Sequence, residues 1–324
     1  MGMQWVKVLT IGLIFAFISM LVFLIAIVLG LTESLFGIIL VYAIILAIEF
    51  FLSPYVVRWV TGCKPADPVI HAELIQMVED IAKRANLPKT PTVYIVEDPS
   101  PNAFAFGTFQ SNSSVAFHTG ILSMLTRDEL ETVIAHEIGH IKNRDTMIMT
   151  IASLIPIILY YAVYYLLVGR DRERSIITVL LGMIGAFIAR LIGQLIVLYL
   201  SRLREFDADA FAKRVTNKPA ALASALAKIS YLNALQYRSM YGMNGSKSIM
   251  NAFYISTPTA ADIYVAEKVA DELQKSGKNF EIDPETLLKL MEREQKSTGV
   301  FELFSTHPPT YKRIKKLLEK EIAY

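Results

Sequence analysis

The sequence predicts a mainly α-helical membrane protein with about four transmembrane helices and an α+β domain that contains a small β-sheet. The 324 residues are 53% hydrophobic and only 19% charged, whereas soluble globular proteins are roughly 25% charged. The apolar residues are concentrated in two blocks, residues 8–57 and 146–201. The remainder has the composition of a soluble domain, so the chain combines membrane and soluble parts.

Charge and cysteine content exclude several classes of protein. The chain has 32 Lys and Arg against 30 Asp and Glu, a formal net charge of +2. This balance gives no electrostatic basis for a nucleic-acid partner, and we expect none. The single cysteine, Cys63, excludes an intramolecular disulfide and any zinc cluster made of cysteines.

The first apolar block predicts a transmembrane hairpin over residues 1–61. Val8–Leu31 carries no charge, and at about 1.5 Å per residue it is long enough to cross a hydrocarbon core of about 30 Å. A signal peptide has an apolar region of only about 7 to 15 residues, so we expect an uncleaved anchor. The chain returns through Ser34–Val57, and we expect Pro54 to mark the end of that helix.

The second apolar block predicts another hairpin over residues 146–201, made of Thr146–Gly169 and Ser175–Ser201. A pair of hydrophobic helices that pack on the soluble domain without spanning is the alternative. Seven basic residues flank the spans on one side and three on the other: Lys7, Arg58, Lys64, Lys142, Arg144, Arg202 and Arg204 against Arg170, Arg172 and Arg174. The positive-inside rule then predicts a multi-pass protein of the cell membrane with both termini and both soluble segments in the cytoplasm.

The two soluble segments are expected to form the α+β domain. Residues 62–145 show patterns typical of an amphipathic helix, a strand and a β-hairpin: Leu74–Ala82, Thr92–Val96, and Asn102–Phe109 with Ser114–Phe117. Thr126 and Glu129 match a capping box, so a helix should begin there. Residues 202–324 predict mainly helices: Pro219–Arg238, Ala261–Ser276, Pro284–Ser297 and Thr310–Ile322.

The capped helix carries the sequence His136-Glu137-Ile138-Gly139-His140, which is HExxH. A spacing of four residues puts both imidazoles on one helical face, where they can bind one Zn²⁺. Glu137 on the adjoining face can act on a water molecule as a base. Two unrelated histidines on a helix surface are the alternative, but the chain has only five histidines in all, which makes a chance match rare.

A catalytic zinc site also needs a third protein ligand and an open fourth position. Glu205 and Asp209 follow the last apolar segment and share a helical face, so either can bind a metal or brace a histidine. His140 precedes the second apolar block by six residues and Glu205 follows it by four. On continuous helices both would lie within roughly 10 Å of the same membrane boundary, provided that the block crosses twice or not at all.

Taken together, the motifs resemble the HtpX-type membrane zinc metalloproteases, which are relatives of the CAAX prenyl proteases. They are HExxH, the ExxxD of Glu205 and Asp209, Asn102-Ala103-Phe104-Ala105, and Ser305-Thr306-His307-Pro308-Pro309 with Arg313. The resemblance implies a zincin-like catalytic domain with one zinc ion per chain, held by His136, His140 and Glu205. Asp209 would then lie behind the ligands. It further implies proteolysis of misfolded membrane proteins as quality control under stress.

Further residues are assigned to peptide hydrolysis. Glu137 would take the proton of the attacking water and give it to the leaving amine. His307 is the candidate donor to the oxyanion, because the resemblance places it near the zinc and two prolines fix the backbone after it; a surface histidine that caps the last helix is the alternative. Arg313 would hold an active-site carboxylate, or lie on a basic face.

The segment Asn102–Phe106 is the candidate substrate-binding strand. A polypeptide can bind by adding a strand to the edge of a sheet, and we expect this of Asn102, Ala103, Phe104, Ala105 and Phe106. The alternative is an ordinary hairpin that packs on the core. Such binding contacts the backbone more than the side chains, so selectivity should be loose.

Three other functions remain to be weighed. A zinc-stabilised scaffold or chaperone in the membrane has no need of Glu137. A transporter or pore is disfavoured because Glu49 and Arg190 are the only charges within the expected spans. A prenyl-protein protease is the nearest alternative, although its relatives enclose a chamber with more spans than this chain can supply.

Overall fold

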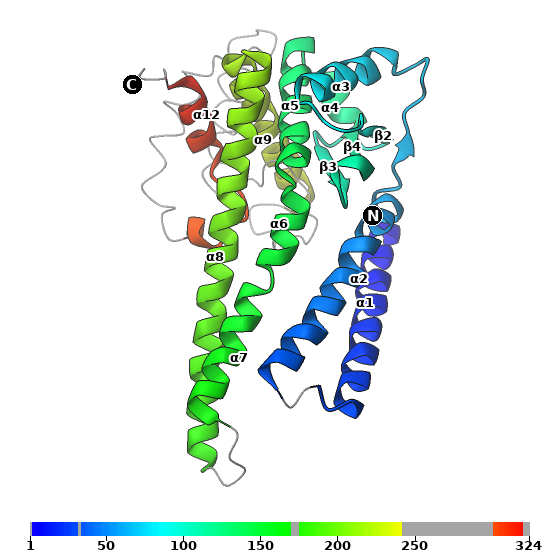
Figure 1. The fold of residues 1–324 in the computed structure, drawn as a ribbon. Helices are drawn as coiled ribbons and strands as arrows, with labels where there is room; N and C mark the ends of the chain where they lie inside the picture. The colour runs from blue at the N-terminus through cyan, green and yellow to red at the C-terminus, as the bar shows by residue number, and fades with distance from the viewer. Residues whose placement is uncertain (1, 32–33, 170–174, 242–300, 320–324) are drawn as a thin grey trace. The chain divides into compact units, whose positions relative to one another are not determined.

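The computed structural model describes residues 2–31, 34–169, 175–241 and 301–319 (Figure 1). The chain forms two compact units, and each is made of two separate stretches of sequence. One comprises Met1–Thr61 and Thr146–Leu200, and the other comprises Gly62–Asp145 and Ser201–Tyr324. The chain therefore passes between the units three times.

The first unit consists of apolar helices. Its elements are α1 (Gly2–Val28), α2 (Leu35–Thr61), most of α6 (Asp145–Ala152), α7 (Ile155–Val168) and the first part of α8 (Ile176–Thr216). By length and composition, three described helical segments can cross a membrane: Leu35–Thr61, Asp145–Val168 and Ile176–Thr216. Gly12–Val28 is a shorter apolar helix. The mainly helical membrane fold is confirmed, with about three candidate spans.

The prediction that Pro54 ends its helix is wrong, because α2 continues to Thr61. Proline lacks the N–H that would bond to the carbonyl four residues earlier, here that of Phe50. The Ser53 hydroxyl donates a hydrogen bond to this carbonyl at 2.9 Å. A neighbouring hydroxyl that binds the freed carbonyl is one way in which membrane helices accommodate proline.

The second unit is built on a four-stranded sheet. Its strands are β1 (Lys64–Pro65), β2 (Thr92–Val96), β3 (Ala103–Gly107) and β4 (Ser113–His118), in the order β1-β2-β4-β3. β3 and β4 pair antiparallel, as the predicted hairpin requires, with Ala103 opposite Phe117. β2 runs parallel to β4, a pairing that the sequence analysis did not predict. β3 is therefore the last strand of the described sheet.

Helix α5 (Arg127–Asn143) begins with the predicted capping box. The backbone N–H of Thr126 donates to Glu129 Oε2 at 2.9 Å, and the Thr126 hydroxyl accepts from the backbone N–H of Glu129 at 3.4 Å. The Glu129 carboxylate also accepts from the Ser224 hydroxyl at 2.6 Å and from Lys228 Nζ at 2.9 Å. Glu129 therefore connects the start of α5 to α9 (Pro219–Tyr241).

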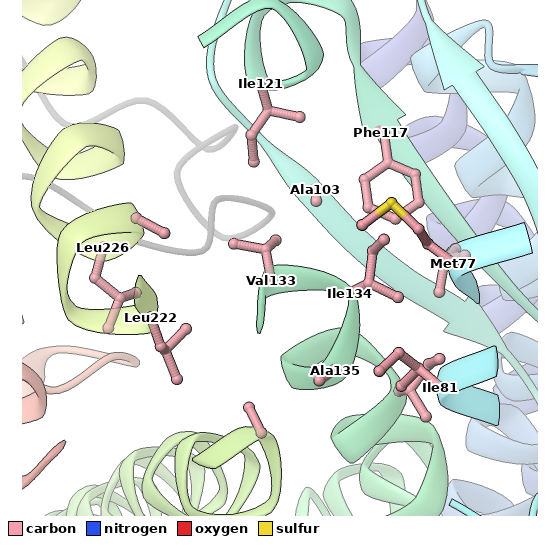
Figure 2. Packing of buried hydrophobic residues seen from close by; sticks show 14 of the residues in the cluster. Met77, Ile81, Ala103, Phe117, Ile121, Val133, Ile134, Ala135, Leu222 and Leu226 are labelled. Atoms are coloured by element: carbon pink, nitrogen blue, oxygen red, sulfur yellow. The ribbon is translucent and has the colours of Figure 1, made fainter. Parts of the chain in front are cut away.

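The hydrophobic core of the second unit surrounds α5. Figure 2 shows Ile134 beside Phe117 of β4 and Met77 of α3 (Ala72–Arg84), while Leu222 and Leu226 of α9 lie on the other side. Burying one such aliphatic side chain is worth roughly 1.5–3 kcal/mol. The helix that bears HExxH is thus held from several sides.

The remaining elements complete the second unit. α4 (Thr119–Met124) follows β4, and α12 (Thr310–Leu318) and α9 lie where helices were predicted. Tyr311, Ile314 and Leu317 of α12 are buried in the core with α9. The helices expected at 261–276 and 284–297 lie outside the described residues.

Candidate metal centre

The structure brings together the three residues expected to bind a metal. His136 and His140 project from α5 and Glu205 from α8, and one ligand atom from each lies within 4.8 Å of the other two. His136 and Glu205 are buried, whereas His140 is partly exposed. The three residues form what we call the metal cluster.

Gly139 lets α5 and α8 approach each other at the metal cluster. A Cβ atom on Gly139 would lie 3.1 Å from the ring of Phe211 and 3.2 Å from the Cα atom of Ala208. Both distances are shorter than ordinary contacts between carbon atoms. The glycine inside HExxH therefore has a packing role beside the two histidines.

His136 is held by a buried carboxylate and a buried guanidinium. Its Nδ1 atom lies 2.9 Å from Oδ1 of Asp209. Arg313 of α12 donates two hydrogen bonds to Asp209, from Nε to Oδ2 at 2.8 Å and from Nη2 to Oδ1 at 2.7 Å. Arg313 Nη1 also lies 3.0 Å from Oε2 of Glu205. Of the two roles considered for Arg313, the structure shows contact with carboxylates of the site.

His140 is held in the same way by residues that the sequence analysis missed. Its Nδ1 atom lies 2.6 Å from Oδ2 of Asp145. Arg204 Nη2 donates to Oδ1 of Asp145 and, at 2.8 Å, to the carbonyl of Asn143. Asp145 lies five residues after His140, outside the spacings of three and four residues that place side chains on one face of a helix.

The ring nitrogens of the two histidines indicate where a cation would bind. Because a carboxylate can only accept, we infer that each Nδ1 carries the proton and each Nε2 a lone pair. The Nε2 atoms of His136 and His140 lie 3.1 Å apart, and each is 3.7 Å from an oxygen of Glu205. Oε2 of Glu205 faces the Arg313 guanidinium at 3.0 Å but accepts no hydrogen bond from the described residues. Three electron-pair donors that converge in this way suit a metal cation.

Electrostatics keep the carboxylates of the site ionised. Burial alone would raise the pKa of Glu205, but His307 and Arg313 outweigh it and the pKa is lowered. Burial opposes ionisation of Asp209 as well, yet the adjacent Arg313 lowers the pKa of Asp209 well below its usual range. Burial would also lower the pKa of Arg313, but Asp209 and Glu205 raise it. Glu205, Asp209 and Arg313 together therefore carry two negative charges and one positive charge.

Glu137 and His307 complete the predicted group of residues. Glu137 is buried on α5, and within the described residues no hydrogen bond to its carboxylate is found. His307 Nε2 lies 3.6 Å from Oε1 of Glu205, and burial lowers the pKa of His307. His307 is thus brought to the metal cluster.

The segment before His307 is held by α8. Arg202 Nη1 donates to the carbonyl of Ser305 at 2.8 Å, and the Ser201 hydroxyl donates to the carbonyl of Thr306 at 2.8 Å. Neither residue was predicted to contribute, because each contacts a segment about 100 residues later in the chain. The turn of α8 that ends at Glu205 therefore also fixes the backbone that carries His307.

The predicted substrate strand lies at the edge of the sheet and not among the ligands. Asn102 O accepts from the backbone N–H of His118 at 3.0 Å, just before Ala103 pairs with Phe117. In an antiparallel pair the hydrogen-bonding direction alternates along each strand. The backbone groups of Asn102, Phe104 and Phe106 therefore point toward β4, and those of Ala103 and Ala105 point away from it.

Comparison with known proteins identifies the relatives of this chain. Residues 68–321 match the model of peptidase family M48. A protease HtpX homologue of Pyrococcus furiosus is 35% identical over 324 residues, covering 97% of this chain and 94% of the relative. Another, from Archaeoglobus fulgidus, is 34% identical over 311 residues, covering 95% and 84%.

A solved structure shares the fold. The crystal structure of S. mikatae Ste24p matches with a TM-score of 0.57 and 20% identity, covering 82% of this chain and 67% of that chain. The resemblance to HtpX-type proteases predicted from the motifs is confirmed. With apolar helices long enough to cross a membrane and a family match over most of its length, the chain is a membrane protease that belongs to peptidase family M48.

Proposed function

We propose that the protein is a zinc-dependent endopeptidase of the cytoplasmic membrane that hydrolyses misfolded membrane or membrane-proximal proteins. The observation that carries the proposal is the convergence of His136, His140 and Glu205, with both histidine Nδ1 atoms at carboxylates. Family membership supports peptide hydrolysis in general. The identities of the metal, of the general base and of the substrates do not follow from family membership and are part of this proposal.

Zinc fits the donor set. Two imidazoles and one carboxylate, with a fourth position open, form a frequent catalytic zinc site, with Zn–N distances of about 2.0–2.1 Å. Two nitrogens at that distance in a tetrahedral arrangement are about 3.3 Å apart, close to the 3.1 Å between the two Nε2 atoms. One zinc ion per chain would polarise the scissile carbonyl and make the attacking water more acidic.

Glu137 and His307 would carry out the proton transfers and charge stabilisation. Glu137 would remove a proton from the water whose oxygen attacks the carbonyl carbon, and would deliver it to the nitrogen as the C–N bond breaks. A buried carboxylate with no hydrogen bond from the described residues is available for this task. His307 would donate from Nε2 to the oxyanion, since its Nδ1 already lies 2.9 Å from the Thr306 hydroxyl.

The edge of β3 would bind the polypeptide. The outward backbone groups of Ala103 and Ala105 can pair with an added strand, and β3 packs against the helix that carries Glu137. Phe104 and Phe106 pack beside each other, with ring centroids 5.8 Å apart. We expect recognition of extended backbone with little sequence preference, as quality control under stress requires.

The two soluble stretches and both termini would lie in the cytoplasm.

Cleavage of an unstructured test protein by the full chain in detergent tests this function. We expect cleavage with added Zn²⁺, and loss of cleavage in Glu137→Gln and after chelation, with return when Zn²⁺ is restored to the wild type. Glu79→Gln on α3, where Glu79 pairs with Lys83 near the surface, is the matched control and should cleave normally.

The outcomes separate the alternatives. Equal cleavage by Glu137→Gln would remove Glu137 from the mechanism. Cleavage that survives chelation would exclude the metal requirement. Tight zinc binding without cleavage by any form, with the test protein unfolded and in excess, would favour the membrane scaffold.

A further inference from the structure

We propose that Asp145 and Arg204 form a positioning pair that orients the His140 ring and thereby sets how tightly the metal cluster binds its ion. Neither residue belongs to the motifs that indicated the metal. The inference rests on the proposed zinc site and deepens it, because it names two further residues on which the site depends.

Asp145 determines which nitrogen of His140 faces the cluster. Its Oδ2 atom lies 2.6 Å from Nδ1, so Nδ1 carries the proton and Nε2 directs its lone pair toward Glu205, 3.7 Å away. A carboxylate behind a ligating histidine fixes the ring and raises the basicity of the ligand nitrogen. Loss of such a partner typically costs 10–100-fold in metal affinity.

Arg204 in turn fixes Asp145. Its Nη2 atom donates to the second carboxylate oxygen, Oδ1, and to the carbonyl of Asn143. One oxygen of Asp145 thus serves the histidine and the other serves the arginine. Arg204 directly precedes Glu205 on α8, so the helix that supplies the third ligand also holds the group that orients the second.

The backbone between His140 and Asp145 is shaped for this contact. Successive residues of an α-helix are rotated by about 100°, so in a continuous helix Asp145 would project about 140° away from His140. Arg144 instead adopts the left-handed conformation, with φ 59° and ψ 39°. This ends α5 and makes Asp145 the first residue of α6, where a carboxylate is also favoured by the helix dipole. A left-handed arginine is uncommon and persists where surrounding contacts determine it.

The same arrangement of arginine, aspartate and histidine occurs at the other histidine. His136 contacts Asp209, and Asp209 accepts two hydrogen bonds from Arg313. Both imidazole ligands therefore end a chain of arginine, aspartate and histidine. The two chains share α5 and α8, but one is completed by Asp145 of α6 and the other by Arg313 of α12. The same geometry at both ligands indicates that it serves the metal as well as the packing of the helices.

Zinc affinity of the full chain in detergent tests the proposal. Metal-free protein is titrated with Zn²⁺ in competition with a chromophoric chelator, and the absorption spectrum of the Co²⁺-loaded protein reports the ligand geometry. We expect Asp145→Asn to bind Zn²⁺ at least about tenfold more weakly and to change the Co²⁺ spectrum. Glu79→Gln removes a negative charge from α3, where Glu79 pairs with Lys83 near the surface, and should stay within about twofold of the wild type.

Variants of Arg204 test whether the pair acts as a unit. Arg204→Met should weaken Zn²⁺ binding, and Arg204→Lys should recover part of the loss because it restores a donor to Asp145. Arg204→Met combined with Asp145→Asn should bind no more weakly than Asp145→Asn alone, because interacting residues show non-additive effects. Circular dichroism of each metal-free variant identifies any that has unfolded, and Arg204→Lys provides the test if the others do.

The proposal is overturned if Asp145→Asn binds Zn²⁺ within about twofold of the wild type with an unchanged Co²⁺ spectrum, or if the effects of the double variant multiply. These results leave the proposed protease intact. Conversely, a wild type that binds Zn²⁺ but cleaves nothing removes the protease while the effects of Asp145 and Arg204 on affinity still stand. A wild type that binds no Zn²⁺ removes the zinc site and the proposal with it.

Discussion

The two histidines of the metal cluster have the same chemical support at different depths. The side chains of His136 and Arg313 are 2% and 1% exposed, whereas those of His140 and Arg204 are 20% and 15% exposed. Buried ion pairs are costly to break because one charge is left without compensation, while pairs nearer to solvent are rehydrated. The buried chain of Arg313, Asp209 and His136 should therefore contribute both to the stability of the fold and to metal binding. The more exposed chain of Arg204, Asp145 and His140 should contribute mainly to metal binding.

The largest expected loss of stability follows from breaking the buried chain of Arg313, Asp209 and His136. Asp209→Asn leaves the guanidinium of Arg313 without its main partner, and we expect a loss of about 4 kcal/mol in the free energy of unfolding of the metal-free protein. Asp145→Asn should lose only about 1 kcal/mol. Chemical denaturation in detergent compares the two directly, and equal losses would contradict the assignment of different roles.

A second prediction concerns Glu129, which anchors the helix that both histidines share. Burial would raise the pKa of Glu129, but hydrogen bonds from Ser224 and Lys228 lower it. Glu129→Gln should lose about 2 kcal/mol of stability at pH 7, with Zn²⁺ affinity unchanged. Asp128→Asn, an exposed neighbour, should change stability by less than about 0.5 kcal/mol.

The pH dependence of this loss has a definite sign. A carboxyl whose pKa is lowered by folding contributes its full stability above its unfolded pKa of about 4.3 and loses it as the pH falls through the folded pKa. The difference in stability between wild type and Glu129→Gln should be constant from pH 6 to 8 and should shrink below about pH 4. A constant difference down to pH 3 would show that the charge of Glu129 is not the cause.

The substitution Gly139→Ala tests whether both Arg–Asp–His chains depend on the distance between α5 and α8. Gly139→Ala would force Phe211 and the backbone at Ala208 to move by a few tenths of an ångström. Overpacking of this kind costs about 1–2 kcal/mol. Because α5 carries both histidines, Zn²⁺ affinity should fall and the Co²⁺ spectrum should change. An unchanged affinity would show that the cluster tolerates separation of α5 and α8.

The smallest effect on stability is expected from substitution of Arg144, whose left-handed turn positions Asp145 beside His140. Glycine adopts the left-handed conformation without strain, so Arg144→Gly should change stability by less than about 1 kcal/mol and leave Zn²⁺ affinity intact. Arg144→Val should cost about 1–2 kcal/mol and weaken Zn²⁺ binding, because a β-branched residue resists this conformation. Similar Zn²⁺ affinities for the glycine and valine variants would separate the turn from the positioning of Asp145.

Local patterns predicted the central helix and the pair of histidines on it, whereas the resemblance to a known family singled out Glu205 from Asp209. The capping box of Thr126 and the HExxH spacing depend only on neighbours along one helix, and both predictions needed no tertiary information. Asp145 was missed because the left-handed Arg144 interrupts the helical period on which the reasoning relied. Arg202 was missed because its hydrogen-bond partner, Ser305, lies 103 residues away.

The sheet and the first hairpin show the same limit. The antiparallel pairing of β3 and β4 follows from a short connection, whereas the parallel pairing of β2 with β4 joins strands that are not consecutive. Pro54 predicts the end of a helix because the hydrogen bond that it cannot make is visible in the sequence. The compensating bond from Ser53 to Phe50 depends on a side-chain rotamer, which the sequence does not specify.

The division of the second unit into two stretches places the expected metal ligands on both sides of the second apolar stretch. A ribosome makes His136 and His140 first, then the apolar stretch Thr146–Leu200, and only afterwards Glu205. A nascent chain therefore lacks a complete ligand set until its second apolar stretch has been made. In the proposed zinc mechanism, a copy of the protease whose synthesis has not reached Glu205 would be unable to cut neighbouring chains, because the third ligand would not yet exist.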